Sequence, residues 1–237
     1  MGWEPLVPVV REKDELMSRS EVDSRSYTRS DVVAFRKTNE DFGGLSNMAP
    51  GYPLMIDRVR IRTSEALYQA CRFPHMPDVQ RMIVEETSPM TAKMRSKPYR
   101  EKSRPDWDNV RVPIMRWCLR VKLVQNHAKF SDLLLATGNR PIVEDSRKDE
   151  YWGARINDTG ELFGKNVLGR LLMELRQQLR EQPEMFEEVH PLRLENFTLY
   201  GRQIPVVSKE ISGARPRENL TEKAKQLKDE APLFARL

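Results

Sequence analysis

The chain has 237 residues with 39% hydrophobic and 32% charged content, enough to bury one hydrophobic core beneath a heavily charged surface. It contains no apolar run of the ~18 residues that a membrane span needs, and its first residues lack the pattern of a secretion signal. Its two cysteines do not make a disulfide framework, so we expect a reduced, cytoplasmic protein without membrane contact. The net charge of +5 is compatible with a polyanionic partner such as nucleic acid.

The first elements expected along the chain are a short strand and a hairpin. Residues 32–35 form an apolar run typical of a strand, and residues 54–61 flank a tight turn at Asp57-Arg58. Capping residues and apolar spacings of three and four then predict a series of helices. We expect these helices at 65–73, 78–86, from Pro89 onward, 106–126, 130–136 and 166–180.

These elements predict a mainly α protein with a small β element, folded as one compact multihelical domain over residues 32–182. Residues 1–31 are charged and irregular, and we expect them to form an N-terminal extension. Apolar periodicity is lost after Pro191, so residues 183–237 are expected to form a C-terminal appendage. Pro113 is expected to kink the helix over 106–126 or to delay its start.

The most informative segment is 142–153, which runs from an apolar strand-like start into acidic residues, then Tyr151-Trp152, then Gly153. A Gly164-Lys165-Asn166 turn follows and opens an amphipathic helix. Carboxylates, aromatic faces and helix-start amides together suit a polar, anionic ligand that carries a ring. The three histidines, His75, His127 and His190, are too scattered for a metal centre, so we expect neither a metal nor a cofactor.

Several separated segments resemble the NADAR superfamily (NAD- and ADP-ribose-associated), which includes a bacterial N-glycosidase of riboflavin intermediates. The resemblance covers roughly residues 32–182. It implies a mostly helical domain with a small β element and hydrolysis of an N-glycosidic bond on ribose. Some members of this superfamily are antitoxins that remove ADP-ribose from guanine in DNA, opposite a DNA ADP-ribosyltransferase toxin. The matching segments are 42–49, 63–73, 88–90, 104–107, 133–138, 142–153 and 164–176.

Two carboxylates are the predicted catalytic pair. Glu65 lies in the first turn of a helix behind Thr63-Ser64, where the helix dipole favours an ionised carboxylate. Asp149 precedes the aromatic pair, and a placed carboxylate is the natural partner of an oxocarbenium-like transition state. Glu144, Asp145 and Glu150 are competitors for this role, because an acidic run is usually a solvated face. Lys97 raises a separate possibility, in which a lysine attacks the sugar C1 and forms a Schiff base.

The predicted ligand-binding residues come from the same segments. Trp107 and Trp152 could stack on a base, or could simply be core anchors. Lys165 and Asn166, at a helix start, are expected to hold a diphosphate. The resemblance extends ligand binding to other members of its segments, namely Phe42, Gly44, Ser46, Asn47, Tyr151 and Gly153.

A basic stretch over residues 93–104 predicts contact with nucleic acid. Its cations alternate with Tyr99 and lie near Trp107, a pattern that suits a phosphate-tracking surface, although solvated side chains would look the same. The residues expected to contact the backbone are Lys93, Arg95, Arg100, Lys102 and Arg104.

The leading hypothesis is therefore a hydrolase that removes ADP-ribose from guanine in ADP-ribosylated DNA, as antitoxin to a DNA ADP-ribosyltransferase toxin. Its partners would be ADP-ribosylated DNA, the ADP-ribose product and the toxin itself. One alternative keeps the bond type but takes phosphoribosyl-amino-pyrimidine intermediates of riboflavin synthesis as substrates. Another is a module that binds ADP-ribose or the toxin without turnover.

Overall fold

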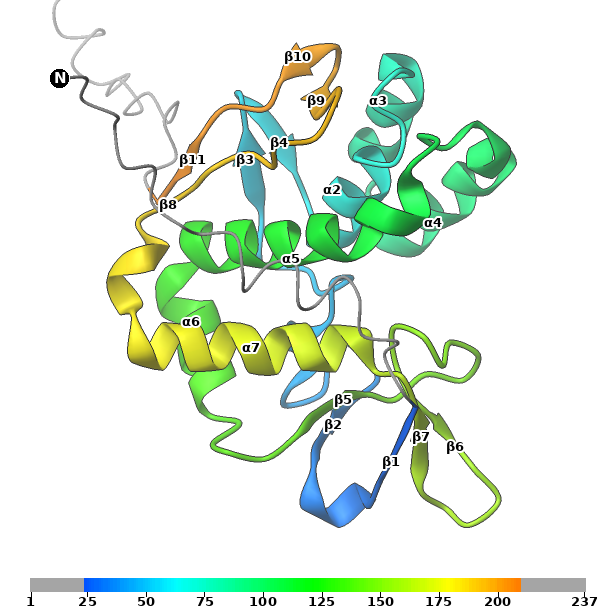
Figure 1. The fold of residues 1–237 in the computed structure, drawn as a ribbon, viewed down its shortest axis with the longest axis vertical. Helices are drawn as coiled ribbons and strands as arrows, with labels where there is room; N and C mark the ends of the chain where they lie inside the picture. Colours follow the sequence, from blue (N-terminus) through cyan, green and yellow to red (C-terminus); the bar gives the residue numbers. More distant parts are fainter. Residues whose placement is uncertain (1–23, 210–237) are drawn as a thin grey trace, which may run out of the picture.

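The computed structural model describes residues 24–209, which form a mixed α/β fold built around one long central helix (Figure 1). The helical elements are η1 (Arg29–Asp31), η2 (Gly43–Leu45), α2 (Ser64–Ala70), α3 (Pro77–Glu85), α4 (Pro89–Ser96), η3 (Lys97–Lys102), α5 (Trp107–Gln125), α6 (His127–Leu135), α7 (Val167–Glu181) and η4 (Pro183–Phe186). The strands are β1 (Arg25–Tyr27), β2 (Val33–Phe35), β3 (Leu54–Ile56), β4 (Val59–Ile61), β5 (Ile142–Glu144), β6 (Arg155–Ile156), β7 (Leu162–Gly164), β8 (Glu188–Val189), β9 (Thr198–Leu199), β10 (Arg202–Gln203) and β11 (Val207–Ser208).

The expectation of a mainly α protein was wrong, because 45% of the structure is helical and 16% lies in strands. The strands that sequence reasoning missed are two or three residues long and are paired by tertiary contacts. Such short segments carry too little periodicity to be recognised in a sequence.

The predicted helices, the strand and the hairpin are confirmed, with bounds shifted by a few residues. Thr63 caps α2 by accepting a hydrogen bond from the Ala66 amide, and Ser88 caps α4 in the same way through the Thr91 amide. Pro113 lies inside α5, which already begins at Trp107, so the expected delay of the helix start does not occur.

Two small sheets shape one end of the molecule. Strands β2 and β5 are parallel, with Phe35 opposite Glu144, so their carboxyl ends meet at the same edge. Strand β7 pairs with β1 and β6 in a three-stranded antiparallel sheet to the right of this pair in Figure 1. The β3–β4 hairpin lies on the other side of α5, and its turn residues Asp57 and Arg58 both have positive φ.

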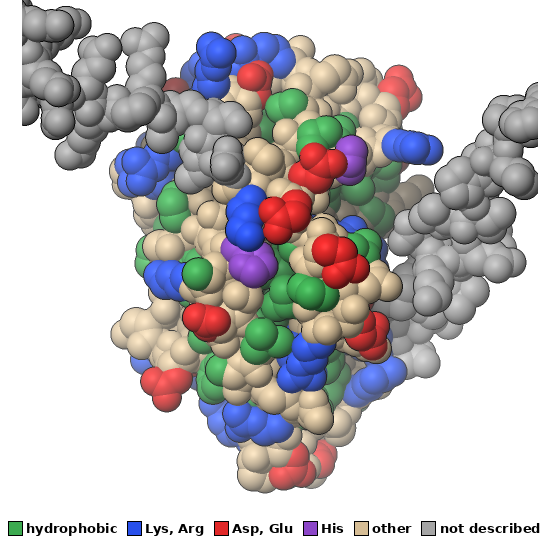
Figure 2. Space-filling model, turned by 90° about the vertical axis from the view of Figure 1, so that its left-hand side faces the viewer, with side chains coloured by type: hydrophobic (Ala, Val, Ile, Leu, Met, Phe, Trp, Pro, Cys, Tyr) green, Lys and Arg blue, Asp and Glu red, His purple; other side chains and the backbone are tan. Residues whose placement is uncertain are grey.

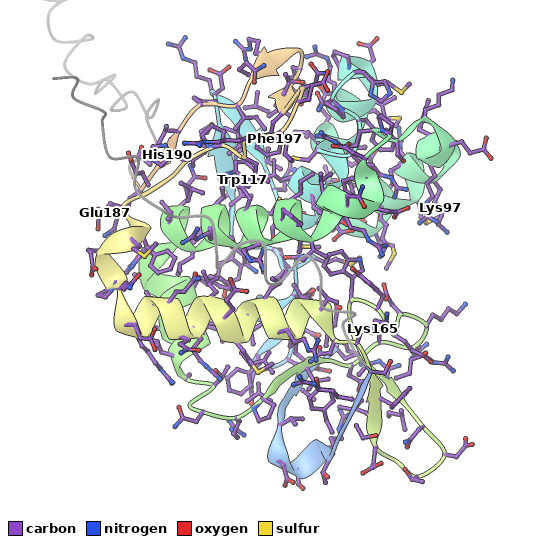
Figure 3. All side chains as sticks on the ribbon, in the orientation of Figure 1. Lys97, Trp117, Lys165, Glu187, His190 and Phe197 are labelled. Carbon is purple, nitrogen blue, oxygen red and sulfur yellow. The ribbon has the colours of Figure 1, made fainter. Side chains whose placement is uncertain are left out.

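The segment after α7 packs into the same hydrophobic core as the helices. Trp117 of α5 donates an indole hydrogen bond to the carbonyl of His190 at 2.9 Å, and its ring meets Phe197 edge-on (Figure 3). Within the described residues, the expected boundary at residue 182 therefore does not separate two cores. The expected N-terminal extension and C-terminal appendage lie partly outside residues 24–209.

None of the helices in residues 24–209 is both long enough and apolar enough to cross a membrane. Figure 2 shows the side of the molecule that is on the left in Figure 1. Acidic and basic side chains are interspersed on this face, so the positive net charge is not concentrated there.

Candidate active site

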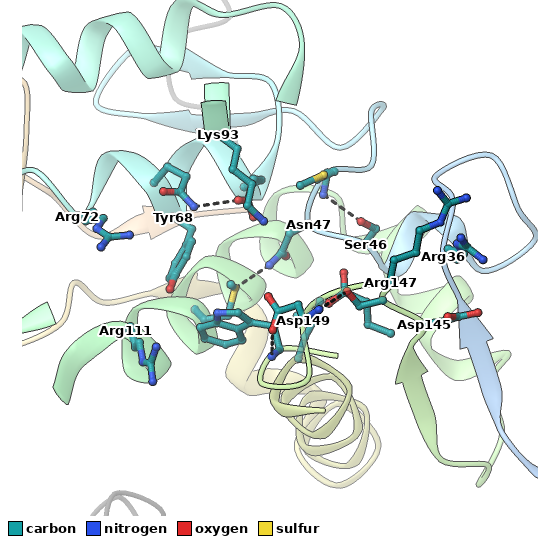
Figure 4. Close-up of a pocket in the computed structure, with 18 of the residues that line it drawn as sticks. Arg36, Ser46, Asn47, Tyr68, Arg72, Lys93, Arg111, Asp145, Arg147 and Asp149 are labelled. Atoms are coloured by element: carbon teal, nitrogen blue, oxygen red, sulfur yellow. Dashed lines mark hydrogen bonds between the residues drawn. The ribbon is translucent and has the colours of Figure 1, made fainter. Parts of the chain in front are cut away.

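A pocket of about 490 Å³ lies between the N-terminal parts of α2 and α5, the carboxyl ends of β2 and β5, and the loop that follows β5 (Figure 4). Its lining is dominated by charged and aromatic side chains. The volume is in the range of sites that bind nucleotides and other small ligands.

Glu65 projects into this pocket from the first turn of α2. Its backbone N–H donates to the carbonyl of Asn47 at 3.0 Å, which ties the helix start to the loop after η2. Its carboxylate accepts a hydrogen bond from Gln69 Nε2 at 3.0 Å, and Gln69 in turn accepts from the Ser96 hydroxyl. Glu65 is only 6% exposed, so the carboxylate is held in one orientation by buried partners.

Glu144 ends strand β5 and provides a second carboxyl group in the same pocket. Burial, followed by the negative charges of Glu65 and Asp149, raises its pKa to about 7, while the positive charge of Lys93 acts in the opposite direction. Its backbone N–H donates to Asn166 Oδ1 at 3.2 Å, which fixes the end of the strand. A carboxyl group with this pKa is partly protonated at neutral pH and can donate a proton.

Asp149 provides a third carboxylate, but one of its oxygens already has a structural role. Oδ1 accepts hydrogen bonds from the backbone N–H groups of Tyr151 at 3.0 Å and Trp152 at 2.9 Å. This turn sets the aromatic pair against the pocket. Oδ2 has no hydrogen bond within the described residues, so it is the oxygen available to a ligand.

Aromatic rings form one wall of the pocket. Tyr68 contacts Trp107 at 5.1 Å and Trp152 at 5.6 Å between ring centroids, and Tyr151 meets Trp152 edge-on at 5.2 Å. Burial raises the pKa of Tyr68, and the Glu65 carboxylate raises it further, so the phenol is a hydrogen-bond donor at physiological pH. These rings offer flat faces and one hydroxyl to a ligand.

Four arginines of the pocket lie at two opposite sides of it, as Figure 4 shows. On one side, Arg72 stacks over Trp107 at 5.0 Å and Arg111 stacks over Tyr151 at 4.0 Å. On the other side, Arg36 and Arg147 are exposed. Asn47 and Asp149 lie between the two groups. No group of side chains suited to hold a metal ion is found in residues 24–209.

The family model described as NADAR domain matches residues 34–180, which contain all the pocket-lining residues. The chain belongs to the NADAR domain family. Relatives include the N-glycosidase YbiA of Escherichia coli, 38% identical over 151 residues, which cover 62% of this chain and 88% of that protein. A riboflavin biosynthesis protein of Vibrio vulnificus is 33% identical over 67% of this chain and 41% of its own length. The NMR structure of E. coli YbiA matches with a TM-score of 0.55 at 35% identity, over 67% of this chain and 90% of YbiA.

The predicted resemblance to NADAR proteins is thereby confirmed, and the pocket collects about half of the residues that the sequence nominated. Both members of the predicted carboxylate pair line the pocket. So do four of the predicted ligand-binding residues and two of the residues predicted to bind nucleic acid. These residues are Glu65, Asp149, Ser46, Asn47, Trp107, Trp152, Lys93 and Arg100.

Lys97 does not reach the pocket of this NADAR domain. It is exposed at the start of η3, and Figure 3 shows it at the outer edge of the molecule. Lys93, one helical turn earlier on α4, lines the pocket instead. A Schiff base through Lys97 is therefore not compatible with this arrangement, because a nucleophile must reach the sugar carbon.

Other predicted ligand-binding residues support the pocket from behind. Asn166 is fully buried, and its amide donates to the Ile142 carbonyl at 2.8 Å. A Cβ at Gly44 would collide with the Tyr52 hydroxyl, and one at Gly153 would lie 2.5 Å from the Glu144 carbonyl, so both glycines allow close packing. These positions shape the site without lining it, because their atoms face the protein interior.

Phe42, Tyr151 and Lys165 lie beside the pocket rather than in its lining. The Lys165 backbone N–H donates to the Glu150 carbonyl, and its ammonium lies 6.0 Å from the Tyr151 ring. Phe42 packs below the Arg140 guanidinium at 6.0 Å. Asn166 is fully buried and Lys165 does not line the pocket, so the expected diphosphate contact of this pair stays a prediction.

The basic stretch is divided by the fold. Arg95 pairs with Glu86 at 2.8 Å, and Lys102 lies outside the pocket lining. Arg104 is 4% exposed and binds Asp106 and the Glu195 carbonyl, so its guanidinium is not on the surface as a phosphate ligand would need to be. Only Lys93 and Arg100 of this stretch line the pocket.

Sequence reasoning missed Tyr68, Gln69, Arg72 and Arg36 as pocket residues, and it named Glu144 only as a competitor for the role of Asp149. Tyr68, Gln69 and Arg72 follow Glu65 by three, four and seven positions, which places them on one face of a helix. Arg36 and Glu144 lie at the carboxyl ends of two strands, where parallel sheets commonly bind ligands. That signal required knowledge that β2 and β5 pair in parallel.

Proposed function

We propose that this chain removes ADP-ribose from guanine in ADP-ribosylated DNA by hydrolysing the N-glycosidic bond at the ribose C1 carbon. Relationship to proteins named N-glycosidase supports a hydrolase of N-glycosidic bonds. The observation that carries the proposal is a pocket that three carboxyl groups, Glu65, Glu144 and Asp149, line together with arginines at two opposite sides.

The two glutamates suit the two halves of such a reaction. Glu65, held by Gln69, would stabilise positive charge at C1 in the oxocarbenium-like transition state. Glu144, with a pKa of about 7, would protonate the departing guanine nitrogen. The C1–N bond then breaks, water adds to C1, and the proton lost by that water is taken up by a carboxylate such as Asp149.

The arginines and rings support a nucleotide-like ligand. Arg72 donates to the Ser103 hydroxyl and stacks over Trp107, so its charge is held in place before a ligand binds. Arg111 is fixed in a similar way over Tyr151. A diphosphate is the group that such a pair of planar cations binds best, and the aromatic wall offers a flat surface to a base.

A lysine Schiff base is the alternative to direct attack by water, and Lys93 is the side chain placed for it. In that route the Lys93 amine would bond to C1 as the nitrogen leaves, and water would later release the sugar. Treatment of a reaction mixture with borohydride would trap the sugar on wild-type protein but not on a Lys93→Ala variant.

The decisive experiment is incubation of the purified protein with an oligonucleotide that carries ADP-ribosyl-guanine, followed by mass measurement of both products. We expect free ADP-ribose and a strand with intact guanine. An unchanged oligonucleotide would reject the proposal. The antitoxin role follows from this activity, because the same reaction would reverse the product of a DNA ADP-ribosyltransferase toxin in co-expression.

A second candidate substrate is a phosphoribosyl-amino-pyrimidine. It is favoured by the relative named as a riboflavin biosynthesis protein, which matches 67% of this chain. Cleavage of this small substrate, with no release from the modified oligonucleotide, would select it. The rate on the small molecule should then depend weakly on salt, because few phosphate contacts are involved.

A further inference from the structure

We infer that Arg36 and Arg147 form a phosphate-binding rim at the mouth of the pocket, which holds the DNA backbone beside the modified base. This inference rests on the proposed function for the nature of the substrate. The sequence predicts backbone contact by the basic stretch over residues 93–104, but the fold directs much of that stretch elsewhere. The rim lies on the opposite side of the pocket from Arg72 and Arg111 (Figure 4).

The two arginines reach the rim from separate elements. Arg36 follows Phe35 at the end of β2, and Arg147 lies three residues after Glu144 at the end of β5. Because these strands are parallel, both side chains leave the sheet at the same edge. The rim is therefore built by tertiary structure from residues more than a hundred positions apart.

Both guanidinium groups are available to a ligand. In the described residues, neither side chain has a hydrogen bond or an ion pair, and both are exposed. This contrasts with Arg72 and Arg111, which are stacked on rings. Free, exposed arginines suit a polymer whose phosphates vary in position from one site to another.

Neither of two nearby acids, Asp145 and Glu40, forms an ion pair with a rim arginine. Asp145 is paired with Arg29 at 2.7 Å, with a carboxylate that is 4% exposed. Glu40 accepts hydrogen bonds from the backbone N–H groups of Arg36 and Lys37, which lower its pKa, so its carboxylate is engaged by the chain and not by the guanidinium. The rim keeps its positive charge.

The rim chemistry favours a phosphodiester over a protein or a lipid. None of the exposed large hydrophobic side chains in residues 24–209 is among the residues that line the pocket. Protein interfaces and membrane contacts normally include such side chains. Lys37 directly follows Arg36 in the sequence, and Lys148 directly follows Arg147, so each rim arginine has a second cation next to it in the chain.

The test is direct binding of an unmodified, fluorescein-labelled DNA duplex by fluorescence anisotropy over a series of salt concentrations. The Arg36→Ala/Arg147→Ala variant should bind about tenfold more weakly at 0.1 M salt. The slope of log affinity against log salt should become shallower by about 0.9 for each phosphate that the variant no longer neutralises. The matched control is Arg60→Ala/Arg193→Ala, which removes the same charge from two exposed arginines outside the pocket and should change affinity less than twofold.

The outcomes separate the rim from the proposed function. An unchanged affinity and salt slope in the rim variant, or no DNA binding by the wild-type protein, overturns the rim. If the wild-type protein cleaves ADP-ribosylated DNA while the rim variant keeps its KM, the function stands and the rim fails. If ADP-ribosylated DNA is not cleaved but the salt slope still becomes shallower in the rim variant, the rim stands and the substrate assignment fails.

Discussion

The two walls of the pocket are built in different ways. The helical wall, formed by α2, α4 and α5, holds its polar groups by buried contacts, such as the chain from Glu65 through Gln69 to Ser96. The wall at the ends of β2 and β5 carries a carboxyl group with a shifted pKa and exposed arginines. Under the proposed function, the helical wall would fix the sugar and phosphates, and the strand-end wall would supply the proton and contact the DNA backbone.

The largest effect is expected from Glu65→Ala on the helical wall. If the proposed role of this carboxylate at C1 is correct, its loss should lower kcat by about a thousandfold. Binding of ADP-ribose, measured by calorimetry, should stay within tenfold because the arginines are retained. Full activity in this variant would contradict the assigned division of the two walls.

Glu144→Gln tests the strand-end wall and should lower kcat by about a hundredfold. Because the pKa of Glu144 is raised to about 7, its proton is available below that pH and lost above it. Wild-type kcat should therefore fall as the pH rises through 7, and this decline should be absent in the variant. A pH profile of kcat for both proteins decides the point, and identical profiles would remove Glu144 from the role of acid.

The same substitution makes a prediction for stability. The raised pKa means that the contribution of Glu144 to folding is fully present below about pH 4.5 and is lost as the pH rises through 7. The wild-type protein should therefore lose stability relative to Glu144→Gln between these values. Urea unfolding at several pH values measures this difference, and a difference independent of pH would argue against the raised pKa.

Asp149 combines both kinds of role, and two substitutions separate them. Asp149→Asn keeps an oxygen for the Tyr151 and Trp152 amides, so it should lower kcat by about tenfold with little change in melting temperature. Asp149→Ala leaves those amides without their partner and should also cost about 1 kcal/mol of stability. Equal stability and activity in the two variants would show that the turn does not depend on this oxygen.

Lys122 supports the loop between the two walls. It is buried, its ammonium donates to the carbonyls of Gly44 and Ser46, and burial lowers its pKa to about 7. Its contribution to stability is therefore present at pH values above its ordinary pKa near 10.5 and is lost as the pH falls through 7. Relative to Lys122→Met, the wild-type protein should lose up to about 1.4 kcal/mol per pH unit in that interval, as measured by urea unfolding. A pH-independent difference would contradict it.

The smallest effect is expected at Arg95, on the outer side of the helical wall. Its ion pair with Glu86 is on the surface, with the arginine side chain 54% exposed. Arg95→Ala should lower stability by less than about 1 kcal/mol, because exposed pairs contribute little. DNA affinity should change less than twofold, and a larger loss would return this position to the nucleic-acid interface.

The sequence anticipated the helical wall better than the strand-end wall. Glu65 could be placed because a capping residue and an apolar pattern fix where α2 begins. Glu144 was only a competitor among several acids, since nothing local distinguishes a desolvated carboxyl group from a solvated one in an acidic run. Glu144 is desolvated where β5 pairs with β2, and these two strands are more than a hundred residues apart in the sequence.

By itself, the sequence determined the family, the main helices and the nomination of Glu65 and Asp149, because capping, periodicity and motif residues are local properties. Tertiary structure decided the mixed α/β class. It decided that Lys93 rather than Lys97 lines the pocket, and that only part of the basic stretch over residues 93–104 reaches it. It also decided which acid carries a pKa near 7 and where the free arginines lie. These features depend on which distant segments exclude water from one another, and that is set only when the chain folds.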